Sequence, residues 1–200
     1  RPRHPSHPKE SPQTGSSLHD ALIKKLTGRV KGAADRESGK SLSDRLAWLE
    51  KKHKDDEKAA AQDAGVSLRT WRRWKEGKAT PSRRSLKKLD QATRAALIPA
   101  GRRRRISLST RAGRIFDRRP KGGFTITAWI TVSSDDRPRT LALGSHLSEG
   151  RLDKVVQAYI NEGEEGAVRE LEDAIREYMG GYQGHLEISN VSNIDFGPIG

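Results

Sequence analysis

The most distinctive motif of the sequence combines three arginines with two tryptophans. They lie in Glu57–Gly77, which reads EKAAAQDAGVSLRTWRRWKEG. Arg69, Arg72 and Arg73 can each donate two hydrogen bonds to the edge of a guanine in a DNA major groove, or neutralise backbone phosphates. The sequence leaves both roles open for each arginine. The pattern predicts that this segment is the centre of a DNA-binding surface.

The residues around these arginines predict a helix-turn-helix, two helices that cross at a tight turn. Ala60 and Ala61 are small enough to let the second helix approach the first. Gly65 can adopt the left-handed conformation that ends a helix, and Val66 can fill the turn. Ser67 suits the N-cap of the next helix. The alternative is an ordinary helical hairpin with a solvated basic face.

The second helix is expected to have one buried and one exposed face. Trp71 and Trp74 are three residues apart, so they share the face that packs on the core with Val66. The opposite face would then meet base edges and phosphates in a major groove. The candidate DNA-binding residues of this helix are Ser67, Leu68, Arg69, Thr70, Arg72 and Arg73, with Lys75 and Lys78 near the DNA backbone.

The charge of the chain is divided unevenly along its length. The whole chain has a formal net charge of +13, yet residues 122–200 carry six basic and thirteen acidic side chains. The excess positive charge of residues 1–121 suits nucleic acid or an anionic membrane surface. No apolar run approaches the ~20 residues of a membrane-spanning helix, and no secretion signal is evident. Nucleic acid is therefore the expected partner, and a cytoplasmic, nucleoid-associated location is expected.

The amino-acid composition gives little support for a catalytic or a metal-binding site. The absence of cysteine excludes disulfides, thiolate zinc sites and a cysteine nucleophile, and the six histidines lack metal-ligand spacing. No metal or cofactor is therefore expected. An enzyme that acts on DNA ends, such as a relaxase or recombinase, is disfavoured as well, because Tyr159, Tyr178 and Tyr182 lie at or near helix faces that look structural.

The N-terminal part is expected to contain a tail, a helical domain and a linker. Residues 1–17 are rich in proline, serine and charge, which predicts a disordered basic tail. Residues 18–101 are expected to form an all-helical DNA-binding domain, with supporting helices capped by Ser43 and Ser82. The arginines of residues 102–105 are expected to form a basic linker, which follows phosphates, enters a minor groove or is merely solvated. These candidate DNA-binding residues are Arg102, Arg103, Arg104 and Arg105.

The remaining residues, 106–200, predict an α+β domain for oligomerisation or partner binding. Alternating β-branched and aromatic residues indicate strands, and apolar residues at helical spacing indicate two helices. This order of elements predicts a small sheet with helices covering one of its faces. The expected strands are residues 105–110, 124–132, 139–143 and 185–196, and the expected helices are Ser148–Asn161 and Glu164–Met179.

Several motifs of the chain together resemble one protein family. They are QDAGVSLRTWRRW, RISLSTRAGRIF, SSDDRPRTL and LEISNVSNIDF, within about Leu18–Phe196. This pattern is similar to that of the terminal proteins of Streptomyces linear chromosomes and plasmids, small basic proteins that cap telomere 5′ ends. The resemblance implies binding to duplex DNA and to telomeric single strands. It also implies a telomere-associated protein and a DNA polymerase as partners, and self-association through the C-terminal part as a homo-oligomer.

The resemblance also implies a site of covalent DNA attachment. In that family the DNA 5′ end is joined to a threonine that precedes two acidic residues, and the corresponding residue here is Ser134. Either hydroxyl can attack a nucleotide α-phosphate held by a polymerase, while Asp135 or Asp136 holds a metal or accepts a proton. The protein would then be the acceptor of a nucleotide and not an enzyme. A solvated hairpin turn over residues 133–136 is the plain alternative.

A repressor remains the alternative function. A dimeric helix-turn-helix repressor of a plasmid or phage would bind a palindrome, with its α+β domain forming the dimer. Such a protein needs no covalent chemistry at Ser134. Footprinting separates the two functions, because a repressor protects two half-sites about one helical turn apart.

Overall fold

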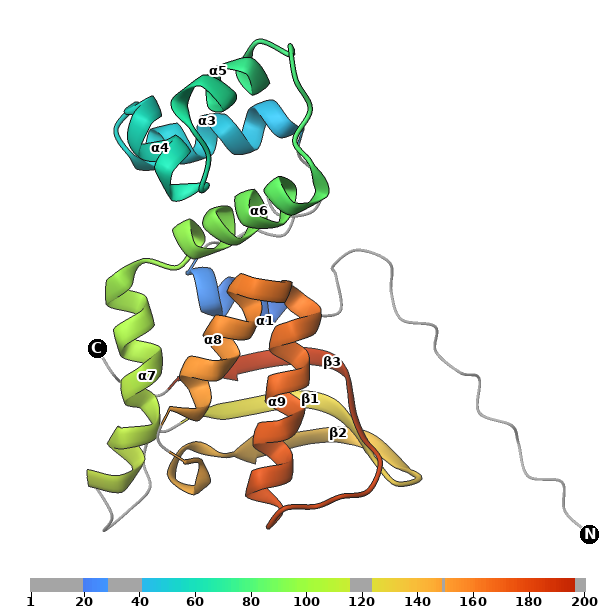
Figure 1. Ribbon diagram of the computed structural model, residues 1–200. Helices are drawn as coiled ribbons and strands as arrows, with labels where there is room; N and C mark the ends of the chain where they lie inside the picture. Colours follow the sequence, from blue (N-terminus) through green and yellow to red (C-terminus); the bar gives the residue numbers. More distant parts are fainter. Residues whose placement is uncertain (1–19, 29–40, 116–123, 149, 197–200) are drawn as a thin grey trace, which may run out of the picture.

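The computed structural model describes residues 20–28, 41–115, 124–148 and 150–196, and it has an α+β fold as expected (Figure 1). The tail expected over residues 1–17 lies outside these ranges. The elements, in chain order, are α1 Asp20–Thr27, α3 Leu42–Lys52, α4 Glu57–Asp63, α5 Leu68–Lys75, α6 Arg83–Leu97, α7 Ala100–Ile115, β1 Thr125–Val132, β2 Asp135–Ala142, a 3-10 turn at Gly144–His146, α8 Arg151–Glu162, α9 Glu164–Tyr178 and β3 Leu186–Asp195.

The first hydrophobic cluster holds α3, α4, α5 and the middle of α6 together as one helical body. Two tryptophans of α5 form its centre, with ring centroids 6.5 Å apart and ring planes tilted by 47°. Alanines of α4 pack against them, which agrees with the small residues expected there. The buried members of this cluster are Leu46, Leu49, Ala60, Ala61, Ala64, Trp71, Trp74, Leu89 and Ala92.

Serine side chains begin three helices of this part of the chain. The Oγ atoms of Ser67 and Ser82 each accept a hydrogen bond from the backbone N–H three residues later, at 3.2 Å. Both expected caps are therefore confirmed. The cap expected at Ser43 is wrong, because Ser43 lies in the first turn of α3. Ser41 caps that helix instead, since its backbone is extended and its Oγ accepts from Asp44 N–H at 3.4 Å.

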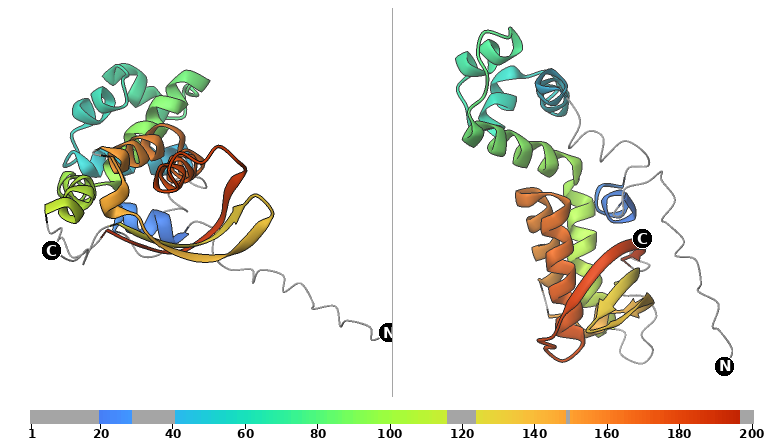
Figure 2. Two further views of the ribbon diagram at one scale, coloured as in Figure 1. Left: turned by 90° about the horizontal axis from the view of Figure 1, so that it is seen from below. Right: turned by 90° about the vertical axis from the view of Figure 1, so that its right-hand side faces the viewer.

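The second hydrophobic cluster lies between a three-stranded antiparallel sheet and the helices that cover one of its faces, and we call this unit the sheet body (Figure 2). The strand order is β2-β1-β3. Ile126, Ala128 and Ile130 of β1 point into the cluster, whereas Trp129 lies on the opposite face and is exposed. This alternation is typical of a sheet with one solvated face. Helix α1, expected in the helical domain, packs against β3 in the sheet body.

The strand expected at residues 105–110 is wrong, because these residues lie in α7. The expected linker, residues 102–105, belongs to the same helix. Pro99 precedes α7 and its carbonyl accepts the first hydrogen bond of the helix at 3.0 Å, so the proline begins a helix where a separate linker was expected. Ile106 is fully buried in the sheet body. The packing of this face of α7 in the sheet body therefore outweighs the weak preference of residues 105–110 for a β-strand.

The other elements of the sheet body agree with the expected ones apart from their ends. Strand β2 begins at Asp135, four residues before its expected start, because it pairs with β1 up to Val132. Helix α8 begins at Arg151, since Gly150 has a left-handed backbone with φ +82°. None of the helices in the described ranges is both long and apolar enough to cross a membrane.

Helix α6 joins the two bodies. Its Leu89 and Ala92 are buried in the helical body, and Ile98, directly after the helix, is buried in the sheet body. The guanidinium of Arg94 also donates a hydrogen bond to the carbonyl of Ile160 at the end of α8, at 3.1 Å. One continuous helix therefore contributes to both cores.

Close packing of α8 on α9 provides a test of the sheet body. A Cβ atom at Gly166 would lie 2.7 Å from the carbonyl oxygen of Ala158 and 2.8 Å from Cβ of Glu162. We expect Gly166→Ala to lower the free energy of unfolding by about 1–3 kcal/mol, measured by urea titration, because backbone atoms cannot move aside. In Gly101→Ala on α7 the new Cβ meets nothing within 4 Å, so that control should be neutral or stabilising. Equal losses in both variants would contradict this packing.

Candidate nucleic-acid interface

Helix α5 has the two faces that the sequence predicts. The side chains of Trp71 and Trp74 are 0% and 5% exposed. Arg69 and Arg73 project from the helix into solvent and form no ion pair with any residue in the described ranges. Because nearby carboxylates do not neutralise them, these two guanidinium groups are available to an external anion.

Two other cations of α5 are held by carboxylates of neighbouring helices. Arg72 Nε lies 2.9 Å from Glu57 Oε2, and Lys75 Nζ lies 2.7 Å from Glu57 Oε1. Lys75 also lies 2.9 Å from Glu50, a residue of α3. Arg72 and Lys75, both expected as DNA contacts, therefore join α5 to α3 and α4. The Arg72 side chain is still 59% exposed, so it can exchange Glu57 for another anion.

Glu50 connects this ion-pair network to the buried core. Its carboxylate accepts a hydrogen bond of 2.7 Å from the indole N–H of Trp71 and is only 13% exposed. Sequence reasoning missed both Glu50 and Glu57. The available signal for Glu50 was its spacing, four residues after the buried Leu46, which places a carboxylate beside the apolar stripe of α3.

The ion pairs shift the titration of the groups that form them. Hydrogen bonds from Lys75 and then from Arg72 lower the pKa of Glu57 below its usual 4.5. Hydrogen bonds to Glu57 and then to Glu50 raise the pKa of Lys75 above its usual 10.5. Glu57 and Lys75 therefore both stay charged near neutral pH.

The other candidates near α5 have mainly local partners. The hydroxyls of Ser67 and Thr70 lie 2.9 Å apart and stabilise the start of the helix. Leu68 is half-buried. Lys78 follows the helix, is exposed, and pairs with Glu76 at 2.6 Å. Among the candidates of this segment, Arg69 and Arg73 are thus the exposed cations without a carboxylate partner in the described ranges.

The four arginines of α7 fall into two pairs. Arg102 donates to the carbonyl of Lys25 at the end of α1, and Arg103 donates to the side chain of Gln157 on α8, both at 3.0 Å. These two arginines join helices of the sheet body. Arg104 and Arg105 are exposed and have no ion pair within the described ranges.

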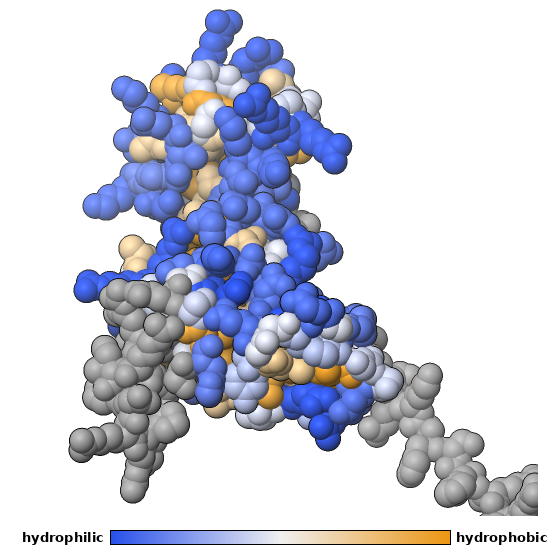
Figure 3. Space-filling view, turned by 60° about the horizontal axis from the view of Figure 1, so that its bottom comes forward, coloured by the Kyte–Doolittle hydropathy of each residue, from blue (hydrophilic) through white to orange (hydrophobic). Residues whose placement is uncertain are grey.

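The candidate cations therefore occupy two separate places. Helix α7 runs along the sheet body, whereas α5 lies in the helical body (Figure 1). On the side of the molecule seen in Figure 3, the helical body displays mainly hydrophilic side chains and the sheet body displays more hydrophobic colouring. The basic residues of α5 and α7 therefore do not form one continuous surface, although the sequence suggested a DNA-binding helix followed by a basic linker.

Ser134 lies at the tip of the hairpin that joins β1 to β2, and it is exposed. The neighbouring Ser133 has φ +56°, and its Oγ shares a hydrogen bond of 2.7 Å with the hydroxyl of Tyr182. Ser133 N–H also donates to the carbonyl of His185 at 2.9 Å. The hairpin tip is thus fixed through Ser133, while the Ser134 hydroxyl faces solvent.

The two carboxylates after Ser134 are engaged by different partners. Asp135 pairs with Arg139 at 2.7 Å and with Arg137 at 3.2 Å. Asp136 accepts hydrogen bonds from the indole of Trp129 and then from the hydroxyl of Thr131, and both lower its pKa. The Asp136 carboxylate therefore stays ionised, and the two carboxylates point to opposite faces of β2.

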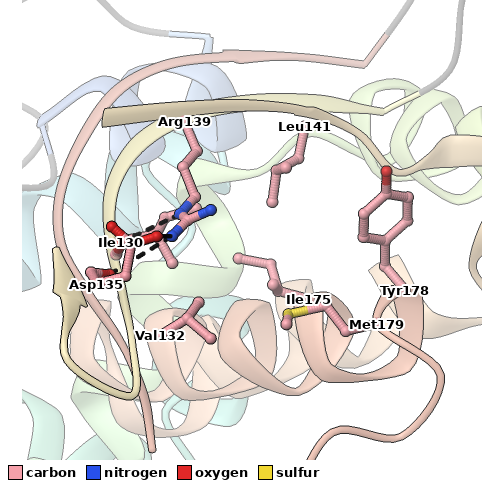
Figure 4. Close-up of a pocket in the computed structure, with 8 residues that line it drawn as sticks. All are labelled: Ile130, Val132, Asp135, Arg139, Leu141, Ile175, Tyr178 and Met179. Carbon is pink, nitrogen blue, oxygen red and sulfur yellow. Dashed lines mark hydrogen bonds and ion pairs between the residues drawn. The ribbon is translucent and has the colours of Figure 1, made fainter. Parts of the chain in front are cut away.

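A mainly apolar cavity of about 290 Å³ opens beside this hairpin (Figure 4). The Asp135–Arg139 ion pair lies at one end of it and Tyr178 at the other. In the described ranges, no cluster of histidine, aspartate and glutamate is arranged to hold a metal ion. The lining residues are Ile130, Val132, Asp135, Arg139, Leu141, Ile175, Tyr178 and Met179.

Comparison with protein-family models, with curated proteins and with solved structures found no match to this chain. Inferences about function therefore depend on the residues of α5 and of the β1–β2 hairpin, together with the resemblance of the motifs that contain them.

The lowered pKa of Glu57 predicts a pH-dependent contribution to stability. A carboxylate with a lowered pKa stabilises the fold above its ordinary pKa of 4.5, and the effect is lost as the pH falls through the lowered value. We expect Glu57→Gln to reduce the urea midpoint at pH 7 and to match the wild-type protein once Glu57 is protonated. Asp173→Asn, at an exposed position in the middle of α9, is the control and should keep the wild-type urea midpoint at both pH values. A constant difference at every pH would contradict the role of the charge.

Proposed function

We propose that the protein binds duplex DNA with a helix-turn-helix made of α4 and α5, and that α5 enters the major groove. The observation that carries this proposal is the division of α5 into a buried tryptophan face and an exposed arginine face. The turn between the helices supports it, because Gly65 has φ +69° and Ser67 caps α5. This is the arrangement that a groove-binding helix requires.

Arg69 and Arg73 are the residues proposed to read the DNA sequence. They are one helical turn apart on the exposed face, and both lack an internal carboxylate partner in the described ranges. A bidentate contact of an arginine with guanine discriminates by about 1–3 kcal/mol against the wrong base. Arg72 and Lys75 first have to leave Glu57 before they can contact DNA, so their net gain on binding is smaller.

The first test compares arginine variants on a duplex selected from a randomised pool. We expect Arg69→Ala and Arg73→Ala each to reduce the discrimination between the selected duplex and a mismatched one by about 1–3 kcal/mol. Arg169→Ala on α9, which removes an arginine that pairs with Glu162, should bind like the wild-type protein. If both α5 variants keep wild-type affinity and discrimination, α5 is not the recognition helix.

We also propose that the protein is a terminal protein of a linear bacterial replicon and that Ser134 carries the DNA 5′ end. The resemblance to that family suggests the role. The exposed hairpin tip supports it, because a polymerase can reach the Ser134 hydroxyl without unfolding the sheet. A telomere-associated protein and the polymerase are the proposed partners, and the chain itself is a nucleotide acceptor.

The chemistry proposed at Ser134 is a transfer of a nucleotide. The Ser134 oxygen attacks the α-phosphorus of a nucleoside triphosphate, a new P–O bond forms, and the bond to the β-phosphate breaks. Pyrophosphate leaves, and the hydroxyl proton passes to a base or to solvent. The polymerase supplies the bound triphosphate and its metal ions. Asp135 and Asp136 follow the acceptor serine, but both already have partners in the hairpin.

The second test follows transfer of label from a radioactive nucleotide in the presence of the polymerase. We expect Ser134→Ala to abolish labelling, and Ser134→Thr to keep it because threonine retains the hydroxyl. Ser133→Ala is the matched control, since that hydroxyl is already bonded to Tyr182 and should not be the acceptor. Label that persists on Ser134→Ala would exclude this residue. Absence of label on the wild-type protein, together with protection of two half-sites in a promoter, would favour a repressor.

A further inference from the structure

Helix α6 carries an exposed basic face that is separate from the DNA-binding face proposed for α5. Leu89 and Ala92 face the helical body, so the basic side chains in the first two turns of α6 point away from that core. Each of these cations is exposed, and none forms an ion pair with a residue in the described ranges. These cations are Arg83, Arg84, Lys87 and Lys88.

Lys88 brings this basic face next to the start of α5. A Cβ atom at Gly65 would lie 3.3 Å from Lys88 Cδ and 3.5 Å from Lys88 Nζ, so the lysine passes over the turn between α4 and α5. Gly65 is two residues before Ser67, the cap of α5. Arg84 lies one turn before Lys88, on the same side of α6. The positive charge therefore continues from the beginning of α5 onto α6.

We propose that Arg84 and Lys88 bind the phosphate backbone of the duplex whose major groove α5 enters. This inference depends on the proposed DNA-binding function and adds a second contact element to it. A helix in a major groove has phosphates on both of its sides, and a neighbouring helix with free cations is placed to neutralise them. A lysine ammonium is a compact point charge with rotatable donors, which suits a phosphate oxygen.

The position of these cations favours DNA over another anionic partner. The same glycine that lets α4 turn into α5 also leaves space for the Lys88 stem. The lysine is thus held at the end of α5 that a groove-binding helix directs towards the bases. The expected contribution is independent of sequence, so it should change affinity and salt dependence without changing base preference.

The test measures the affinity of the full chain for a selected duplex over a series of salt concentrations. We expect Lys88→Gln and Arg84→Gln each to lower the slope of log affinity against log salt by about 0.9, and the double variant by about twice that amount. Between 50 and 200 mM salt each single variant should therefore lose about 3.5-fold less affinity than the wild-type protein. Lys88→Arg should restore the wild-type slope, because it keeps the charge.

A control and two outcomes distinguish this inference from the proposed DNA-binding function. Lys154→Gln, at an exposed position of α8 in the sheet body, is the control and should keep the wild-type slope. If the wild-type protein binds with a steep slope and the α6 variants match it, the α6 surface is excluded while the role of α5 stands. If the wild-type protein binds no duplex, both proposals are wrong. Circular dichroism of each variant checks that the helices remain folded.

Discussion

The hydrogen bond from the indole of Trp71 to Glu50 is the contact on which the arrangement of α5 depends. It is made at 2.7 Å by a fully buried ring and a carboxylate that is almost buried. A buried indole N–H without a partner would be costly, so the bond fixes both the depth and the rotation of α5. Because Glu50 also pairs with Lys75, the same carboxylate determines which cations face inward. Arg69 and Arg73 are exposed as a consequence.

The sequence predicted local structure well where several signals coincided, and poorly where one signal stood alone. In α4 and α5 the small residues, the left-handed glycine, the serine cap and the tryptophan spacing all agree, so their positions were predictable. Residues 105–110 show only a weak alternation of apolar and polar residues. They form part of α7 instead, because Ile106 packs in the core of the sheet body. The roles of Glu50 and Glu57 depend on how three helices meet, which no local pattern specifies.

The partners of basic side chains within the fold also explain why the number of basic residues alone does not locate the candidate site. The chain carries 39 basic residues, yet Arg72, Lys75, Arg102 and Arg103 use their donors to join helices of the fold. An arginine that already has a good partner gains little when it exchanges that partner for a phosphate. The cations left for a polyanion, such as Arg69 and Arg73, can be identified only when the neighbouring helices are in place.

The sharing of α6 between two cores has a geometric consequence. A helix is stiff along its axis, and this one is anchored in its middle by Leu89 and at its C-terminal end by Ile98 and the Arg94 bond to α8. Helix α5 and the hairpin tip are therefore held at a set separation and a set relative orientation. If the protein binds a duplex through α5 and carries a strand end on Ser134, α6 would set the number of base pairs between the site bound by α5 and the DNA end.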